Sequence, residues 1–480
     1  MILTIRIKKA YNSIPLAVKA SLWFIFCSVL QKCIAVITTP IFTRLMTTEQ
    51  YGQFNVYNSW LQIVTLVTTL RLNGAVFNKG MSLYKDDRGT YTSTMQLITF
   101  GLSTVAFILY LLFKNIISNL IELPTFIVGA MFAELMFTPA IDFWTVRKRY
   151  EYIYKPVVIR TLLMALLNAI VGVVAVLFSS EKGYARIISC VTINILFGIY
   201  IFIINFKDSK KPFDISYAKF AIAFNLPLML HYVSQYILEQ FDRIMIQKMV
   251  SIAAAGIYGV AYSIGLLLRI VTTSVNNALV PWQYDKLEKK EFKKLDDTMF
   301  SILIIIAAVS LILSCLAPEI MKLLADKKYY EGVYVIPPVS LGLFFSFFYT
   351  IYANIEFFYS KNKFSMYISM SGAALNIILN YFGIKFFGYI AAAYTTLICY
   401  AFFSIGHFIY TRSIIVHECN YKLNAHKMII VSVLLLIFDV MFTFVYDIIL
   451  IRYLLILLII MFAFVFRKRI KEAMVTIQEK

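Results

Sequence analysis

The chain has 480 residues, of which 60% are hydrophobic and only 15% are charged, and its mean hydropathy is +0.77. Soluble globular proteins are about half apolar and about a quarter charged, so this composition excludes an ordinary soluble enzyme or binding module. The formal net charge of +19 would suggest nucleic acid as a partner of a soluble chain, but here the basic residues cluster between apolar runs. The composition therefore predicts an all-α integral membrane protein.

About fourteen apolar segments of roughly 20 residues follow along the chain, each long enough to cross ~30 Å of hydrocarbon as a helix. Their expected bounds are 17–43, 51–76, 91–113, 124–146, 156–178, 184–205, 217–247, 253–279, 297–317, 333–359, 364–384, 388–411, 427–446 and 448–466. Residues 1–16 before them are typical of a short amphipathic helix on the cytoplasmic surface. With this end inside, roughly 31 of the 45 Lys and Arg fall in cytoplasmic segments, which predicts that both termini are cytoplasmic.

Polar side chains recur along one face of segment 51–76, at steps of three or four residues. They are Asn55, Asn58, Gln62, Thr65, Thr69 and Asn73. Hydrocarbon does not tolerate such a stripe, so we expect it to face a water-filled cavity or another helix. Asn55, Asn58 and Gln62 are therefore candidate substrate-binding residues. Arg71 lies on the opposite side near the cytoplasmic end, where a snorkelling arginine is the better interpretation.

A second polar face runs along segment 253–279 and contains an arginine. It comprises Tyr258, Tyr262, Gly265, Arg269, Thr273 and Asn276. Arg269 lies about 22 Å from the outer end of the segment, so its face predicts an anion site, with a snorkelling or paired arginine as the alternative. Tyr262 and Asn276 are candidate ligands beside it. Lys32, near the middle of the first segment, is a further candidate because a mid-membrane lysine is costly.

Carboxylates inside apolar segments are candidates for coupling to an ion gradient. Glu239 and Asp242 share a face of segment 217–247, which Pro227 should break and could turn into a hinge. The spacing favours a structural pair of Glu239 with Arg243, leaving Asp242, or the pair, as the coupling group.

Two further acids, Glu134 and Asp439, stand alone in apolar segments, whereas Glu356 shares one face of segment 333–359 with other polar residues, namely Ser346, Tyr349, Tyr352 and Ser360. For Glu134 and Asp439 a coupling role and a satisfied structural role are equally good predictions, and Glu356 joins the coupling candidates. The sequence contains no Gly-rich phosphate loop, and its six cysteines lack metal or redox spacing, so we expect no ATP, cofactor or metal.

The chain contains an internal repeat. A shift of 204 residues aligns Gly52–Val76 with Gly256–Val280 without a gap, and a Val-Thr-Thr run followed by Asn recurs in both. The shift equals six segments, an even number, so both halves run in the same direction through the membrane. It predicts two parallel six-helix lobes, 17–205 and 206–411, followed by residues 412–480 with two extra helices and a basic cytoplasmic tail.

Several short motifs resemble those of one transporter family. They are the run Gln50–Tyr57 opening the second segment, Asp242-Arg243 with Ala255–Tyr262 in the second lobe, and the basic-aromatic turn Arg147–Tyr152. On these residues the chain resembles Wzx-type oligosaccharide flippases of the multidrug/oligosaccharidyl-lipid/polysaccharide exporter superfamily. Lys32 matches no motif of that family, so its candidacy rests on its position alone.

The resemblance implies a V-shaped central cavity between the lobes. It also implies a bacterial cytoplasmic (inner) membrane protein that moves polyprenyl-diphosphate-linked oligosaccharide from the inner to the outer leaflet for O-antigen or capsule-like polysaccharide. The expected partners are this substrate, the bilayer, H⁺ or Na⁺, and a polysaccharide polymerase with its chain-length machinery.

Two other functions compete with this prediction. A multidrug or organic-cation antiporter of the same fold should have an acidic, aromatic cavity, and Lys32 and Arg269 count against it. A membrane polysaccharide polymerase or ligase needs large outer loops with acid, base or arginine clusters. The longest expected outer loop, Pro318 to Gly332, is short. We therefore expect a transporter and not an enzyme.

Overall fold

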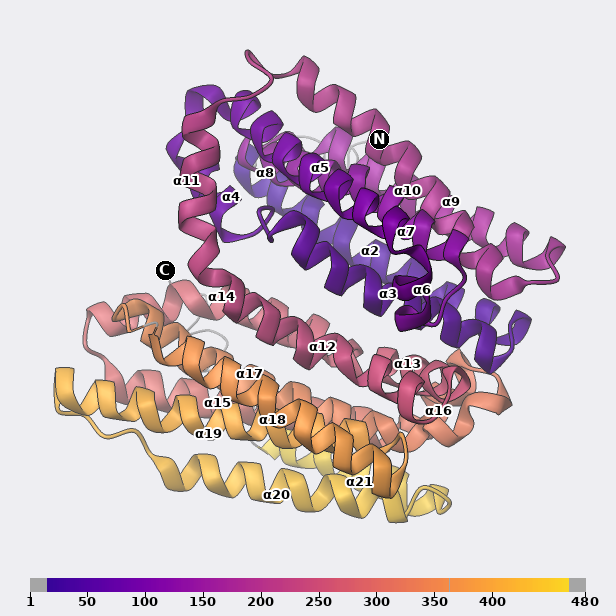
Figure 1. Cartoon of the computed structure of the whole chain (residues 1–480). Coiled ribbons are helices and arrows are strands. Elements are labelled where there is room, and N and C mark those ends of the chain that lie inside the picture. Colours follow the sequence, from indigo (N-terminus) through magenta and orange to yellow (C-terminus); the bar gives the residue numbers. More distant parts are fainter. Residues whose placement is uncertain (1–14, 362, 466–480) are drawn as a thin grey trace, which may run out of the picture. The chain divides into compact units, whose positions relative to one another are not determined.

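The computed structural model describes residues 15–361 and 363–465, and this part of the chain contains helices and no strand. The all-α class predicted from composition is therefore confirmed. The chain divides into two compact units, Met1–Tyr232 and Val233–Lys480, which are described separately below (Figure 1). Most of the predicted surface segment 1–16 and of the basic tail lies outside the described residues.

The first unit is a bundle built around one long helix, α10 (Lys182–Lys207), which packs against α9, α7, α3 and α8. Figure 1 shows these helices running alongside one another. The other elements of the unit are α2 (Leu16–Leu45), α3 (Thr48–Thr69), α4 (Ala75–Leu83), η1 (Lys85–Asp87), α5 (Arg88–Leu112), α6 (Lys114–Ile121), α7 (Thr125–Phe137), α8 (Pro139–Tyr150), α9 (Lys155–Phe178), α11 (Ile215–Asn225) and η2 (Leu226–Leu228).

The second unit has its core around α17 (Ile336–Phe358), which packs against α19 (Ala391–Cys419), α15 and α14. Its apolar centre includes Phe344, Phe348 and Tyr352, which are fully or almost fully buried. The remaining elements are α12 (Met229–Met249), whose first turn precedes the division, α13 (Ile252–Gly265), α14 (Leu267–Glu288), α15 (Phe292–Cys315), α16 (Ala317–Leu324), η3 (Lys327–Val335), α18 (Lys363–Phe387), α20 (Ala425–Phe444) and α21 (Ile449–Val465).

Eleven helices in the described part are long and apolar enough to cross a membrane. They are Val18–Leu45, Lys85–Leu112, Thr125–Tyr150, Lys155–Phe178, Lys182–Lys207, Ile252–Glu288, Phe292–Cys315, Lys327–Phe358, Met366–Phe387, Ala391–Cys419 and Ala425–Phe444. Each corresponds to one of the fourteen predicted segments. Of the other three, segments 51–76 and 217–247 are each interrupted, and segment 448–466 contains a shorter apolar helix. The count of fourteen therefore stays a prediction.

Segment 51–76 does not form the continuous helix that its polar stripe predicted. Helix α3 ends at Thr69, because Leu70 and Arg71 adopt left-handed backbone angles with φ of 48° and 54°. The side-chain amide of Asn225, from α11, donates to the carbonyl of Leu70 at this break. A tertiary contact from 155 residues away thus accompanies a conformation that the local sequence does not favour.

Segment 217–247 is broken where its proline predicted. Pro227 lies in η2, between α11 and α12, and contributes no N–H to a continuing helix. Helix α11 packs on α5 and α4 of the first unit, and the division between units follows at Tyr232. The division therefore lies inside the predicted segment and not at 205/206. A hinge at Pro227 and a V-shaped central cavity stay predictions.

The 204-residue repeat appears in the helix ends. Helices α2 and α12 end at Leu45 and Met249, and α3 and α13 begin at Thr48 and Ile252, so both pairs differ by 204. The residues before the second pair are both N-caps. Thr47 Oγ1 accepts from the backbone N–H of Gln50 at 3.1 Å, and Ser251 Oγ accepts from the backbone N–H of Ala254 at 3.0 Å.

We expect Gly198→Ala to lower the thermal stability of the protein by several degrees. A Cβ at Gly198 in α10 would lie 2.9 Å from the carbonyl carbon of Phe137, at the end of α7, so backbone would have to move. Gly101→Ala is the matched control, because a Cβ there meets nothing within 4 Å. Melting of both variants in detergent would check this, and equal melting temperatures would contradict it.

Candidate functional site

The polar stripe of α3 is shorter than predicted and is partly satisfied by its own helix. Asn58 Nδ2 donates to the Phe54 carbonyl at 2.9 Å, and Thr69 Oγ1 donates to the Thr65 carbonyl at 2.7 Å. Gln62 is exposed, and Asn55 is half-buried. Asn73 lies beyond the break and donates to Asp142 of α8 at 2.8 Å. The stripe thus consists of Asn55, Asn58, Gln62 and Thr65, with Asn73 in a separate contact.

Arg269, the strongest candidate for an anion site, forms an ion pair within the second unit. Its Nη1 lies 3.1 Å from Oε1 of Glu239, which comes from α12. About a third of each side chain stays accessible, 36% for Arg269 and 33% for Glu239. A pair this accessible gains little net energy from its attraction, because solvent screens it. The contact with Glu239 orients the guanidinium, and the exposed part of the Arg269 side chain can still donate hydrogen bonds to a ligand.

The predicted side-chain pair of Glu239 with Arg243 is wrong. Arg243 Nη1 instead donates to the backbone carbonyl of Glu239 at 3.1 Å and to Oε1 of Gln240 at 3.2 Å. Its guanidinium also lies over the ring of Tyr262, 4.4 Å from the centroid. Arg243 is thus a buried structural cation, and Glu239 is left to face Arg269.

The other two candidates on this face, Tyr262 and Asn276, make different contacts. Tyr262 is buried and lies beside Tyr258, with ring centroids 5.6 Å apart. Asn276 accepts a hydrogen bond from Asn354 of α17 at 3.0 Å, and Asn354 also donates to Gln283 at 3.0 Å. Asn276 belongs to a polar network inside the second unit, whereas Arg269 keeps an accessible side chain.

Asp242 lies at the centre of a buried polar cluster, and only 1% of the residue is exposed. Three side chains from three helices donate to its carboxylate. They are Tyr258 of α13 at 2.8 Å, Asn380 of α18 at 2.8 Å and Thr396 of α19 at 2.9 Å. Asn376 extends the cluster by donating to Thr396 at 3.2 Å, and Thr395 donates to Asn380. One amide N–H and two hydroxyls therefore donate to a single buried carboxylate, which is a group that could bind a proton or a small cation in their place.

Glu134 is the corresponding buried acid of the first unit, and it has partners that the sequence did not reveal. Tyr57 of α3 donates to its Oε2 at 2.6 Å, and Asn194 of α10 donates to its Oε1 at 2.6 Å. Asn168 of α9 then donates to Asn194 at 3.2 Å. Each carboxylate oxygen of Glu134 accepts a hydrogen bond, so it joins α3, α7 and α10.

The remaining candidates do not join one site. Lys32 is exposed on α2, and no hydrogen bond or ion pair links it to another residue of 15–361 or 363–465. Glu356 is fully buried between α17 and α19 and contacts His407, at 2.8 Å. Asp439 of α20 accepts from Ser314 at 2.7 Å and serves helix packing. The structure thus brings together Arg269 with Glu239, and separately Asp242 with its donors.

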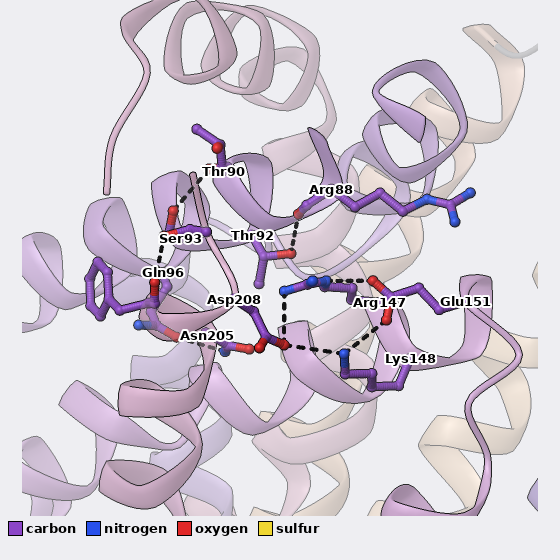
Figure 2. Close-up of polar contacts among 12 residues, drawn as sticks. Arg88, Thr90, Thr92, Ser93, Gln96, Arg147, Lys148, Glu151, Asn205 and Asp208 are labelled. Atoms are coloured by element: carbon purple, nitrogen blue, oxygen red, sulfur yellow. Dashed lines mark hydrogen bonds and ion pairs between the residues drawn. The ribbon is translucent and has the colours of Figure 1, made fainter. Parts of the chain in front are cut away.

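The basic residues Arg147 and Lys148, in the last turn of α8, form internal ion pairs (Figure 2). Arg147 and Lys148 both contact Glu151, at 2.7 Å and 2.8 Å, and both contact Asp208 after α10, at 3.5 Å and 3.2 Å. Nearby, Asn205 of α10 donates to Gln96 of α5 at 2.7 Å. This cluster fixes the ends of α8 and α10 and is not an open basic patch.

Sequence reasoning missed Thr395, Thr396, Asn194 and His407. Each is a buried or half-buried polar residue inside an apolar run, which is the signal that could have found it. Among the described residues, no group of three or more His, Cys, Asp or Glu side chains could hold a metal ion.

Comparisons with known proteins show the family of the chain. Residues 17–285 match the family described as "Polysaccharide biosynthesis protein", and residues 227–382 match the MatE family. The chain is also similar to "Lsg locus putative protein 1" of Haemophilus influenzae, with 21% identity over 72% of this chain and 86% of that protein.

Two solved structures share the fold. "Lipid II flippase MurJ, inward closed conformation" has a TM-score of 0.69 and 15% identity, covering 94% of this chain and 99% of that one. An inward-facing multidrug resistance MATE family transporter of the MOP superfamily has a TM-score of 0.59 and 13% identity, covering 81% and 95%. With more than half of its length matched by one family, the chain is a multi-pass membrane protein that belongs to the polysaccharide biosynthesis protein family, on the MOP-superfamily fold.

Proposed function

We propose that this protein is a flippase that moves polyprenyl-diphosphate-linked oligosaccharide units from the inner to the outer leaflet of the bacterial cytoplasmic membrane. Its product would feed surface polysaccharide assembly of the O-antigen or capsule type, by way of a polymerase. The observation that carries the proposal is the accessible ion pair of Arg269 on α14 with Glu239 on α12, in a member of the polysaccharide biosynthesis protein family. Both termini would be cytoplasmic.

The chemistry of such a substrate matches the residues on α14 and α3. A diphosphate-linked headgroup carries about two negative charges and many hydroxyls, and each unsatisfied polar group in hydrocarbon costs several kcal/mol. Arg269 offers a planar fork that suits phosphate oxygens, and part of it is reachable. Asn55, Asn58 and Gln62 would supply hydrogen bonds to sugar hydroxyls, with alternating access as the mode of movement. Lys32 is a further cation for the headgroup.

The energy source in this proposal is an ion gradient acting on Asp242. A carboxylate held by three neutral donors in a dry cluster can exchange them for a cation, and either H⁺ or Na⁺ would satisfy it. Glu239 is the second coupling candidate, because its partner Arg269 would also be the partner of the substrate anion. Glu134, hydrogen-bonded on both oxygens, is better explained as a structural acid.

Depletion of the protein should trap lipid-linked oligosaccharide in the inner leaflet. The direct test is a leaflet assay in proteoliposomes, in which an enzyme outside the vesicle modifies only substrate on the outer leaflet. Purified protein should expose the trapped pool, and empty vesicles should not. If the pool stays equally protected in both, the flippase proposal fails.

A second candidate is an organic-cation antiporter, which the MatE match over residues 227–382 and the acids Glu239 and Asp242 favour. Growth with and without cationic dyes separates the two functions. A strain lacking a flippase should tolerate the dyes as the wild type does and lose surface polysaccharide, whereas a strain lacking an antiporter should become dye-sensitive and keep its polysaccharide.

A further inference from the structure

One side of α14 is polar and exposed. Thr273 and Asn277 follow Arg269 at steps of four residues, so the three side chains lie on the same side of the helix, and both Thr273 and Asn277 are exposed. The opposite side includes Leu279 and Trp282, which are buried in the apolar core of the second unit. The helix therefore packs through one side and leaves Arg269, Thr273 and Asn277 accessible on the other.

This exposed side differs from that of a helix in contact with lipid. Helix α9 exposes large apolar side chains, among them Ile159, Leu166 and Ile170, as a surface in hydrocarbon should. Helix α14 belongs to the membrane-spanning segment Ile252–Glu288, which the structure describes throughout, and no large hydrophobic side chain of this segment is exposed. Because exposed polar groups are costly in hydrocarbon, this side of α14 meets water or a polar ligand.

The polar neighbours of Thr273 and Asn277 on the same helix have internal partners. Thr272 and Ser274 each donate to a backbone carbonyl of α14, at 3.2 Å and 2.7 Å, and Asn276 accepts from α17 at 3.0 Å. Across the described part of the chain, the side chains of Thr273 and Asn277 make no hydrogen bond. Their donors and acceptors are therefore available to a ligand.

The helix also offers a backbone acceptor at Asn277. Pro281 lies four residues further along α14 and has no N–H, so the Asn277 carbonyl lacks the donor that a regular helix would supply. The side-chain amide of Asn277 can both donate and accept. One residue thus presents three hydrogen-bonding groups next to one another.

The first unit uses the same residue types differently. In the 204-residue register, Thr69 and Asn73 occupy the positions of Thr273 and Asn277. Thr69 donates to a carbonyl of its own helix at 2.7 Å, and Asn73 donates to Asp142 at 2.8 Å. Of the two matched pairs, the one in the second unit is left available for a ligand.

We propose that Thr273 and Asn277 bind hydroxyl groups of the sugar units next to the diphosphate, while Arg269 binds the diphosphate itself. This inference rests on the proposed function and extends it by placing an anion subsite and a hydroxyl subsite on one helix. Thr273 and Asn277 lie about 6 Å and about 12 Å from Arg269 along the helix axis. The sequence of α14 has no charged residue between Arg269 and Asp285, so a cation is followed by neutral donors and acceptors. A sugar-bearing diphosphate has the complementary order, with its charge first and its hydroxyls after it.

Binding of two lipids to the whole purified protein, measured apart from transport, tests this assignment. One probe is the polyprenyl-diphosphate oligosaccharide extracted from the cells that make the protein, and the other is polyprenyl diphosphate without sugar. We expect Thr273→Val and Asn277→Ala each to weaken binding of the sugar-bearing lipid by about 3-fold to 10-fold, which is the worth of a hydrogen bond. Binding of the sugar-free lipid should stay unchanged, whereas Arg269→Ala should weaken binding of both.

Two further variants are controls for this experiment. Ser274 is exposed on the same helix, but its hydroxyl already donates to the Ile270 carbonyl, so Ser274→Ala should bind both lipids as the wild type does. Thr273→Ser keeps the hydroxyl and should bind the sugar-bearing lipid nearly as tightly as the wild type. Because Thr273 and Asn277 are exposed and make no internal hydrogen bond, their variants should also melt at the wild-type temperature.

The outcomes separate this inference from the proposed function. If Thr273→Val and Asn277→Ala both bind the sugar-bearing lipid as tightly as the wild type, the inference is wrong and the flippase proposal stands. An equal loss for the two lipids, or an equal loss in Ser274→Ala, would likewise overturn the assignment, because neither would be an effect of these residues on sugar. A wild-type protein that binds neither lipid would contradict the proposed function, and the inference with it.

Discussion

Arg269→Ala is expected to reduce export of lipid-linked oligosaccharide at least about 100-fold while leaving the amount of protein in the membrane unchanged. Losing a bidentate, charge-assisted contact to a phosphate costs about 3 kcal/mol, which corresponds to that factor. Protein abundance should survive, because the pair with Glu239 is about one-third exposed and contributes little to stability. Leaflet assays and immunoblots would measure the two quantities.

Two further variants sharpen this expectation. Arg269→Lys keeps the charge and loses the planar fork, so export should fall by less than in Arg269→Ala. Arg160→Ala is the matched control. Arg160 of α9 is a half-buried guanidinium that lies over the rings of Trp144 and Tyr200, but it belongs to the first unit and is not a candidate ligand. Normal export by Arg269→Ala would remove this residue from the substrate site.

Asp242→Asn is expected to abolish uphill, gradient-driven transport and to leave passive equilibration of substrate between leaflets largely intact. The amide has nearly the same shape as the carboxylate and can still accept from Tyr258, Asn380 or Thr396, so the helices stay joined. It has no negative charge, so neither H⁺ nor Na⁺ can be bound and released there. Flipping measured with and without an imposed ion gradient separates the two activities.

Asp242→Ala should behave differently from Asp242→Asn. It leaves three buried donors without an acceptor, at about 1–3 kcal/mol each, so we expect lower abundance as well as lost coupling. Asp439→Asn is the control for a buried membrane carboxylate, because Asp439 accepts from Ser314 and touches none of the candidate residues. Gradient dependence that persists in Asp242→Asn would assign coupling to another group, with Glu239 next in line.

Much of the fold follows from local sequence. Apolar length located the membrane helices, and Pro227 marked the break before α12, because a proline removes a helix donor. The end of α3 could not be predicted in this way. Leu70 and Arg71 are ordinary helix formers, and their left-handed conformation accompanies a hydrogen bond from Asn225, far along the chain.

The sequence predicted which charged residues lie inside the helix bundle, but it did not predict which side chains they contact. Glu239 and Arg243 have ideal spacing for a helical pair, yet the carboxylate turns to Arg269, thirty residues away on α14. Likewise, Glu134 has no evident partner in the sequence, but in the structure Tyr57 and Asn194 donate to its carboxylate. Spacing along one helix describes neighbours on that helix only, whereas buried charges are satisfied across helix interfaces.

The 204-residue register matches helix boundaries but not charges. The first half has Ala35, Thr38 and Thr65 where the second has Glu239, Asp242 and Arg269. These three charges therefore occur in one half alone, although the helices that hold them have counterparts in the other. Replacing α12 by its counterpart α2 would place Thr38 where Asp242 accepts from three buried donors, so we expect that exchange to lower the amount of protein in the membrane.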